Sequence, residues 1–317
     1  MRIPSRPRSC VAAVWIILAV VSLPVLCSGA LGQSDTPAID HVRVLVHDIG
    51  ASQKTLQWLG FEMSRPEPSV YQEGSAHNSA HFSDGTYLEL IGIADREKLL
   101  KSRPWIVDFL QYHQGAHSVG IIVTSAKEVA DRLQAQAIDA SLFALRGSNP
   151  DAKPILLITP KLANIADGAI FFVEYPWKRS SSAQVNQPNT AQGTIAVWIL
   201  VKNLEEASKE MERIGFHSRR PLKFDVLGAR GREFEIGDGK LLLLEPDSPG
   251  KSASDFSRER GEGVIGLTLC VSDIKRAQSL LEEDTHRKLP TYDGIYGKSF
   301  LVPAELANGV WIEMAQK

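Results

Sequence analysis

Four side chains that could bind a metal ion or move a proton lie in or beside apolar runs of this sequence. Glu89 and Glu174 lie inside such runs, and His41 and His117 each begin one. A strand presents every second side chain to one face, so Glu89 shares a face with Tyr87. A lone buried carboxylate is costly unless it is paired or bound to a metal. Together these residues are candidates for one site. For each residue taken alone, the alternative is a position at a strand end where the side chain faces water.

Three further polar side chains are candidates for contact with a ligand. Arg43 lies two residues after His41 and therefore on the same predicted strand face. A buried arginine can hold a carboxylate or an enolate oxygen, and a surface position after a shift in register is the alternative. Tyr87 shares the face of Glu89, and His77 or Asn78 is expected to line the same cavity.

An internal repeat determines which elements position these residues. Without a gap, the segment from His41 aligns with the segment from Ala196. The alignment contains three matches: His41-Val-Arg-Val-Leu-Val-His-Asp48 with Ala196-Val-Trp-Ile-Leu-Val-Lys-Asn203, Gly60-Phe61 with Gly215-Phe216, and Arg65-Pro66 with Arg220-Pro221. An ungapped match of this length indicates duplicated structural units.

Each copy has the same local plan. An apolar, β-branched run predicts a buried strand, and Asp48 or Asn203 then takes a helix N-cap position. Gly60 or Gly215 ends the helix, and extended segments follow. Two more divergent copies are predicted, with a strand and a helix over 117–136 and again over 266–283. The order is βαβββ four times, which predicts an α+β fold.

The linkers favour pairing of the first module with the second and of the third with the fourth. The segment 179–192 is polar and predicts a linker between domains. We therefore expect one domain over 37–178 and another over 193–317. Each domain would consist of two modules that share one cupped sheet.

The paired βαβββ plan resembles the vicinal-oxygen-chelate superfamily. Three motifs look like its glyoxalase-like subgroup: Ile39-Asp-His41, Gly85-Thr-Tyr-Leu-Glu89-Leu-Ile91 and Phe171-Phe-Val-Glu174-Tyr175. The resemblance covers nearly all of the first domain and, in degraded form, the second. It implies that two modules form a cupped sheet around one divalent metal ion, either Zn, Fe, Mn, Ni or Co.

By the same resemblance, the metal ligands are His41 and Glu89 from the first module and His117 and Glu174 from the second. Imidazole nitrogen and carboxylate oxygen suit such a metal. Glu89 or Glu174 is then the catalytic base, which leaves the metal to accept a proton.

The second domain lacks most of this ligand set. On the repeat alignment His41 becomes Ala196, Glu89 becomes Leu243, and only Glu313 remains of the four. A four-ligand site is therefore not expected there. The contrast also indicates that the polar residues of the first domain are not requirements of the fold.

Three functions are compatible with these residues. The first is a metal-dependent lyase or isomerase that acts on a small oxygenated molecule. The second is an extradiol-type dioxygenase with Fe(II) held by His41, His117 and Glu174, against which a fourth ligand at Glu89 counts. The third is a metal-free protein that binds or sequesters a small molecule, as bleomycin-resistance relatives do. No nucleophile elbow, P-loop or dinucleotide fingerprint is found.

The N-terminus predicts export. Three arginines precede an apolar run over 11–26, and small residues follow, which is typical of a secretory signal peptide over residues 1–32. We expect a periplasmic or extracellular protein that is free of the membrane after cleavage. The formal net charge of -2 gives no basic face for nucleic acid, so the expected partner is a small molecule.

Overall fold

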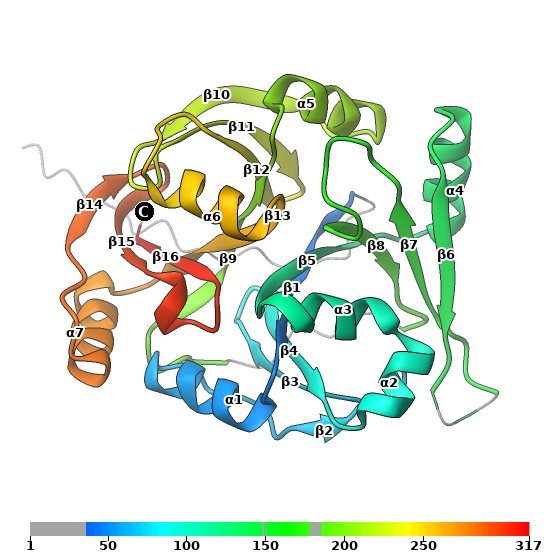
Figure 1. The fold of residues 1–317 in the computed structure, drawn as a ribbon, viewed down its shortest axis with the longest axis horizontal. Helices are drawn as coiled ribbons and strands as arrows, with labels where there is room; N and C mark the ends of the chain where they lie inside the picture. Colours follow the sequence, from blue (N-terminus) through cyan, green and yellow to red (C-terminus); the bar gives the residue numbers. More distant parts are fainter. Residues whose placement is uncertain (1–35, 148, 150, 178–184, 317) are drawn as a thin grey trace, which may run out of the picture.

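A computed structural model describes residues 36–147, 149, 151–177 and 185–316. The predicted signal peptide and part of the predicted linker lie outside the described residues. Within them, no helix is long and apolar enough to cross a membrane. Figure 1 shows the arrangement of the helices and strands.

The first two modules form one sheet. Module one contains β1 (Ala38–Val46), α1 (Ile49–Trp58), β2 (Glu67–Pro68), β3 (Ser75–His81) and β4 (Tyr87–Ile93). Module two contains β5 (Gly115–Ile122), α4 (Ala126–Ala135), β6 (Ala140–Leu145), β7 (Ile155–Pro160) and β8 (Ile170–Glu174). Helices α2 (Arg96–Ser102) and α3 (Pro104–Tyr112) connect the two modules.

The last two modules repeat this plan. Module three contains β9 (Ala191–Leu200), α5 (Leu204–Arg213), β10 (Ser218–Phe224), β11 (Ala229–Ile236) and β12 (Gly239–Pro246). Module four contains β13 (Gly263–Val271), α7 (Ile274–Thr285), β14 (Thr291–Gly294), β15 (Gly297–Val302), the short 3-10 helix η1 (Ala304–Leu306) and β16 (Trp311–Gln316). Helix α6 (Ser252–Arg260) connects them.

The two sheets have equivalent topology. Each is 8-stranded, with the orders β2-β3-β4-β1-β5-β8-β7-β6 and β10-β11-β12-β9-β13-β16-β15-β14. The first strands of paired modules run antiparallel at the centre, and each is parallel to the last strand of its own module. The predicted α+β fold of paired βαβββ modules is confirmed.

The same local signal starts the helix of every module. The side chains of Asp48, Ser125, Asn203 and Asp273 each accept a hydrogen bond from a backbone N–H three residues later. This bond satisfies one of the N–H groups that a helix leaves unpaired at its start. The strand-to-helix turn is therefore fixed four times by one short polar side chain, as the repeat predicted for Asp48 and Asn203.

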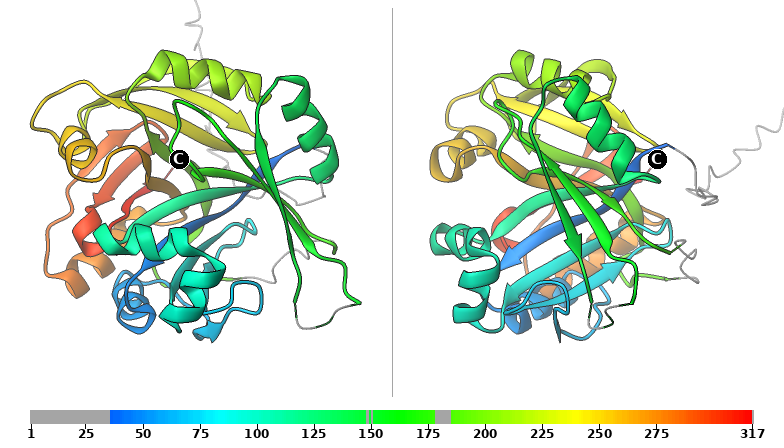
Figure 2. Two further views of the ribbon diagram at one scale, coloured as in Figure 1. Left: turned by 45° about the vertical axis from the view of Figure 1, so that its right-hand side comes forward. Right: turned by 90° about the vertical axis from the view of Figure 1, so that its right-hand side faces the viewer.

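Each sheet has two different faces. On β1, the side chains of Val42, Val44 and Val46 belong to a large apolar cluster that also includes the second sheet. Helices α1, α4, α5 and α7 contribute to this cluster, and we name this side of each sheet the core face. Figure 2 shows α4 and α5 lying side by side at one end of the molecule.

The opposite side of each sheet, which we name the cupped face, carries the alternate side chains. On β1 these include Arg43 and Leu45, and Leu45 packs against Ile106 and Val107 of α3. Helix α3 therefore covers part of the cupped face of the first sheet. In the second sheet α6 has the same position, because Ala253 packs with Trp198.

Candidate active site

Glu89 is the centre of a polar cluster on the cupped face of the first sheet. Its carboxylate accepts a hydrogen bond from Nε of Arg43 at 3.2 Å. Nε2 of His41 lies 3.6 Å from the same oxygen, and Nδ1 of His77 lies 3.5 Å from the other. Arg43 and Glu89 are direct neighbours across β1 and β4, so the sheet register brings them together. Four polar side chains from three adjacent strands thus converge.

His41 is held by a buried aspartate beside it in the sequence. Nδ1 of His41 lies 2.6 Å from Oδ2 of Asp40, and both side chains are buried. Successive strand residues normally face opposite sides, but an irregularity in register between Ile39 and His41 brings the two side chains together. An ionised carboxylate only accepts hydrogen bonds, so Nδ1 of His41 carries the proton and Nε2 has a lone pair. Nε2 has no hydrogen-bond partner among the described residues.

Two tyrosines extend this network. The hydroxyl of Tyr175 donates to Oδ2 of Asp40 at 2.7 Å, which leaves the Tyr87 hydroxyl to donate to Tyr175 at 3.1 Å. The ring of Tyr87 also stacks on the ring of His41, with centroids 4.6 Å apart. Burial, and then the charge of Asp40, raises the pKa of both tyrosines. Both remain neutral donors that support the charge of Asp40.

Arg43 lies flat against an aromatic ring. Its Cζ is 4.0 Å from the centroid of Phe171, a cation–π contact. Phe171 pairs with Gly120 across β8 and β5, as Glu89 pairs with Arg43 across β4 and β1. The second module therefore places an aromatic ring where the first places a carboxylate.

His117 lies on the same sheet but outside the cluster. Its ring contacts Trp105 and Phe109 of α3, with centroids 4.6 Å and 5.2 Å away. Burial, reinforced by the charge of Arg43, lowers the pKa of His117 to about 3. His117 is a neutral ring in an aromatic environment, and no ion pair joins it to Glu89.

Glu174, expected from the sequence as a ligand and a base, lies outside this cluster at the start of a helix. Its carboxylate accepts a hydrogen bond from the backbone N–H of Ala126, the first residue of α4, at 2.6 Å. Glu245 and Gln316 bond the first residues of α5 and α7 in the same way. An acid or amide at the end of the last strand therefore stabilises the module's own helix N-terminus.

Asn78 is also displaced from the expected position. Its amide nitrogen donates to Oε1 of Gln53 in α1 at 3.1 Å, on the core face. Because strand side chains alternate, its neighbour His77 lies on the cupped face and reaches Glu89. The alternative expectation that His77 lines the site is therefore the one that fits.

The second sheet has apolar residues where the first sheet has Arg43 and Glu89, and the residue equivalent to Glu89 differs by one position from the sequence alignment. Arg43 corresponds to Trp198, which pairs with Leu242, so Leu242 rather than Leu243 takes the place of Glu89. Glu313 is fully buried and accepts hydrogen bonds from Thr268 at 2.7 Å and from Tyr292 at 2.8 Å. Burial raises its pKa. The polar cluster of the first sheet has no equivalent here.

The side chains do not fit the metal ion that the resemblance implies. Among the described residues, no group of three or more His, Cys, Asp or Glu side chains is arranged to hold a metal. Glu174 caps a helix, His117 is among aromatic rings, and Glu89 already binds Arg43. A guanidinium beside the carboxylate opposes a second cation through like-charge repulsion.

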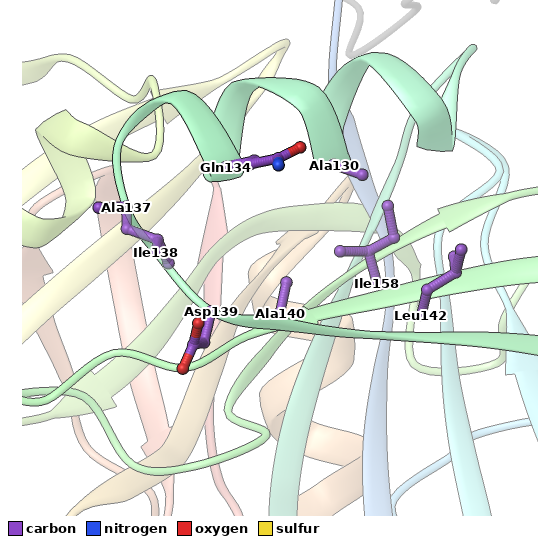
Figure 3. Close-up of a pocket in the computed structure, with 8 residues that line it drawn as sticks. All are labelled: Ala130, Gln134, Ala137, Ile138, Asp139, Ala140, Leu142 and Ile158. Atoms are coloured by element: carbon purple, nitrogen blue, oxygen red, sulfur yellow. The ribbon is translucent and has the colours of Figure 1, made fainter.

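One pocket lies away from this cluster. It has a volume of about 370 Å³ and lies between α4 and the β6–β7 hairpin (Figure 3). Ile158 belongs to the apolar core cluster, so this part of the wall is on the core face. Gln134 and Asp139 are the polar side chains in the wall, which offers no acid–base pair.

The sequence analysis did not identify Asp40 and Tyr175 as members of this hydrogen-bond network. Asp40 stood inside the quoted Ile39-Asp-His41 motif, but strand alternation placed it on the wrong face. Only the irregularity in strand register brings it beside His41. Tyr175 follows β8 and meets Asp40 across the sheet, a contact between distant segments that no local pattern indicates.

Comparisons with known proteins agree on the family. Residues 39–215 match the description of a glyoxalase-like domain, which confirms the resemblance to the glyoxalase-like branch of the vicinal-oxygen-chelate superfamily. No curated protein matches the chain. Relatives in this superfamily bind a divalent metal ion, but the described residues show no such site.

Solved structures share the fold at low sequence identity. A 4-hydroxymandelate synthase mutant from Streptomyces coelicolor matches with a TM-score of 0.65 and 13% identity, over 89% of this chain and 93% of its own. A hypothetical protein from Staphylococcus aureus matches with a TM-score of 0.58 and 10% identity, over 89% and 99%. A methylmalonyl-CoA epimerase from Mycobacterium tuberculosis has 20% identity but a TM-score of only 0.37, over 40% and 89%.

Proposed function

Because this chain belongs to the glyoxalase-like domain family, we propose that it is an enzyme that moves a proton on a small oxygenated molecule. The reaction class is a lyase or an isomerase. The cluster around His41 and Glu89 on the first sheet is the active site, and His41 is the base. This assignment replaces the expected bases Glu89 and Glu174 because Glu89 is paired with Arg43 and Glu174 caps α4.

The observation that carries the proposal is the orientation of His41. Asp40 holds the proton on Nδ1 of His41. Nε2 therefore carries a lone pair, and it has no hydrogen-bond partner among the described residues. A histidine oriented by a buried carboxylate is suited to general base catalysis near neutral pH. The two tyrosines on Asp40 support its negative charge, which stabilises the imidazolium that forms when His41 takes a proton.

The chemical step follows from the neighbours of His41. Nε2 removes a proton from a carbon beside a carbonyl group, the C–H bond breaks, and its electron pair moves to the carbonyl oxygen. Arg43 and His41 both lie beside the same carboxylate oxygen of Glu89, so the guanidinium is close to the base. Its positive charge stabilises the enolate oxygen. Return of the proton gives an isomerase, and loss of a leaving group from the next carbon gives a lyase.

Exchange of carbon-bound hydrogen tests this function without knowledge of the natural substrate. The full chain is incubated in D₂O with pyruvate, phenylpyruvate, acetoacetate or hydroxyacetone, and loss of the C–H signal is followed by proton NMR. We expect enzyme-dependent exchange of at least one compound. Replacement His41→Gln is expected to slow this exchange by about 100-fold or more, because the base is removed.

The matched control is His217→Gln, which replaces an exposed histidine of the second sheet and should leave exchange unchanged. Equal rates in wild-type protein and His41→Gln would contradict the proposal. Binding of these compounds without any exchange would favour a binding or sequestering protein instead.

Export is a separate proposal that rests on the N-terminal sequence. Basic residues, an apolar run over 11–26 and a small-residue segment support a signal peptide over 1–32. Mass spectrometry of the protein from the periplasm or medium of an expressing cell should find a first residue near Gln33. Full-length protein retained inside the cell would contradict export.

A further inference from the structure

The guanidinium of Arg43 is partly buried, and only some of its N–H groups have a hydrogen-bond partner among the described residues. Its side chain is 12% exposed, Nε donates to Glu89, and Phe171 covers one face of the group. The two terminal nitrogens of Arg43 donate to no described residue. A guanidinium has five N–H groups in a fixed fork, and the pair of terminal nitrogens matches the two oxygens of a carboxylate. The free edge of Arg43 is therefore suited to a planar anion.

Unpaired polar atoms surround this edge. Oγ of Ser118, the direct cross-strand partner of Arg43, is buried and has no hydrogen-bond partner among the described residues. The same holds for Nε2 of His41 and Nδ1 of His117. Because buried polar groups are almost always hydrogen-bonded, the unpaired Oγ of Ser118 beside Arg43 and the unpaired Nε2 of His41 in the same cluster indicate a place for a polar ligand.

A second cation lies near Arg43. Arg103, at the junction of α2 and α3, has its Cζ 5.9 Å from the ring of Phe143 and forms no ion pair among the described residues. Burial, and then the charge of Arg43, lowers the pKa of Arg103, whose Nη1 donates a hydrogen bond to the backbone carbonyl of Ser102 at 2.8 Å. An anion bound at Arg43 would also be attracted by the charge of Arg103.

We propose that Arg43, with Ser118 beside it and Arg103 nearby, binds the carboxylate of the substrate. Arg43 thereby supplies the positive charge that a metal ion supplies in relatives of this fold. The rings of Phe171 and Phe143, which contact the two arginines, favour an apolar, preferably aromatic, group on the same molecule. The substrate class is a small carboxylate with a flat apolar substituent. This inference rests on the proposed function in one respect, that the reacting carbon of the substrate lies beside His41.

The charges of the surrounding residues are consistent with this ligand. Asp40 and Glu89 contribute two negative charges, and Arg43 and Arg103 contribute two positive charges, while His117 is neutral. Asp40 is shielded by hydrogen bonds from His41 and Tyr175, and Glu89 is paired with Arg43. The charge of Arg43 is therefore balanced by Glu89, its terminal nitrogens are left to donate hydrogen bonds, and the positive charge without an opposite partner among the described residues is that of Arg103.

The test compares phenylacetate with its neutral analogue phenylacetamide, using the full chain and isothermal titration calorimetry. We expect wild-type protein to bind phenylacetate more tightly than the amide by about tenfold or more, because a charged hydrogen-bonded pair is lost with the amide. Arg43→Gln should abolish the preference, and Ser118→Ala should reduce binding of phenylacetate by a smaller factor. Arg230→Gln, which removes an exposed arginine on the second sheet, is the matched control.

A double variant distinguishes loss of the binding site from loss of the folded state. Arg43→Gln leaves Glu89 without its partner, so Arg43→Gln with Glu89→Gln removes both charges and retains hydrogen-bonding groups. The double variant should fold, as judged by circular dichroism and thermal melting, and should bind the acid and the amide equally. Retained preference for the acid in a folded double variant would overturn the inference, as would equal affinity of wild-type protein for both probes or binding of neither.

The outcome is separable from that of the proposed function. Arg43-dependent binding of phenylacetate without hydrogen exchange on any compound would leave the carboxylate site standing and contradict the enzyme. Exchange on hydroxyacetone that depends on His41, together with equal affinity of wild-type protein for phenylacetate and phenylacetamide, would support the enzyme and overturn the carboxylate site.

Discussion

The two sheets place different chemistry at the same register. Arg43 pairs with Glu89 across β1 and β4, and Thr268 pairs with Glu313 across β13 and β16. Arg43 and Glu89 are 12% and 17% exposed, whereas Glu313 is 0% exposed. The first pair is an ion pair that a ligand can reach. The second is a buried acid whose oxygens are already bonded to hydroxyl groups.

The cupped faces differ accordingly in what covers them. On the second sheet Trp198 is fully buried, packs against Phe224, and donates through its indole nitrogen to Thr268 at 3.1 Å. Phe256 of α6 adds to the same apolar cluster. On the first sheet the corresponding position is Arg43, and unpaired polar atoms surround it. The same fold thus accommodates apolar packing around Trp198 and a polar cluster around Arg43 at equivalent positions. The polar cluster is therefore not required for folding.

The largest expected effect tests whether the cupped face of the second sheet is a packed core. Trp198→Ala removes a fully buried ring and should lower the free energy of unfolding by about 3–5 kcal/mol. Urea denaturation followed by circular dichroism gives this value. The rate at which the folded variant exchanges carbon-bound hydrogen of the test compounds should be unchanged, because His41 and Arg43 lie on the other sheet. A loss below about 1 kcal/mol would mean that this face is not packed as described.

A smaller effect concerns the proton on Glu313. Burial raises the pKa of this carboxyl above its ordinary value of 4.5, so the folded state keeps the proton when the unfolded chain releases it. The associated stability is complete below pH 4.5 and is lost as the pH rises through the raised folded pKa. Glu313→Gln should therefore flatten the decline in melting temperature above this pH. An unchanged pH profile would contradict a raised pKa.

The control for this experiment comes from the first sheet. Glu89→Gln alters the residue at the same register, where Arg43 pairs with the carboxylate. It should not produce the same flattening. If both variants changed the pH profile alike, the contrast between the two carboxylates would be lost.

The fold could be predicted because its signals are local and repeated. Asp48 and Asn203 fit the helix N-cap from residue type alone, and the structure shows equivalent caps at Ser125 and Asp273. Alternation within the apolar strands placed Arg43 on the face of His41 and Tyr87 on the face of Glu89, and the strand register makes Arg43 and Glu89 neighbours. These features depend on short-range geometry, which a single sequence contains.

The rest of the site could not be predicted because it depends on small departures from regular geometry. One irregularity in β1 turns Asp40 toward His41, against strand alternation. Glu174 is the last residue of β8, three residues beyond Phe171, which takes the position equivalent to Glu89, so its carboxylate reaches the start of α4 instead of Arg43. A shift of one residue moves a side chain to the other face, and sequence patterns do not fix strand register to that accuracy.

The smallest expected effect tests this reassignment of Glu174. Glu174→Ala and Glu245→Ala each remove a carboxylate that bonds the first N–H of a helix, α4 in one sheet and α5 in the other. Each should lower the free energy of unfolding by about 1 kcal/mol, because a helix start loses one charged hydrogen bond. Neither should alter hydrogen exchange or binding of phenylacetate. Two variants with equal stability losses and intact activity would establish a shared structural role, whereas loss of activity in Glu174→Ala alone would return this residue to the active site.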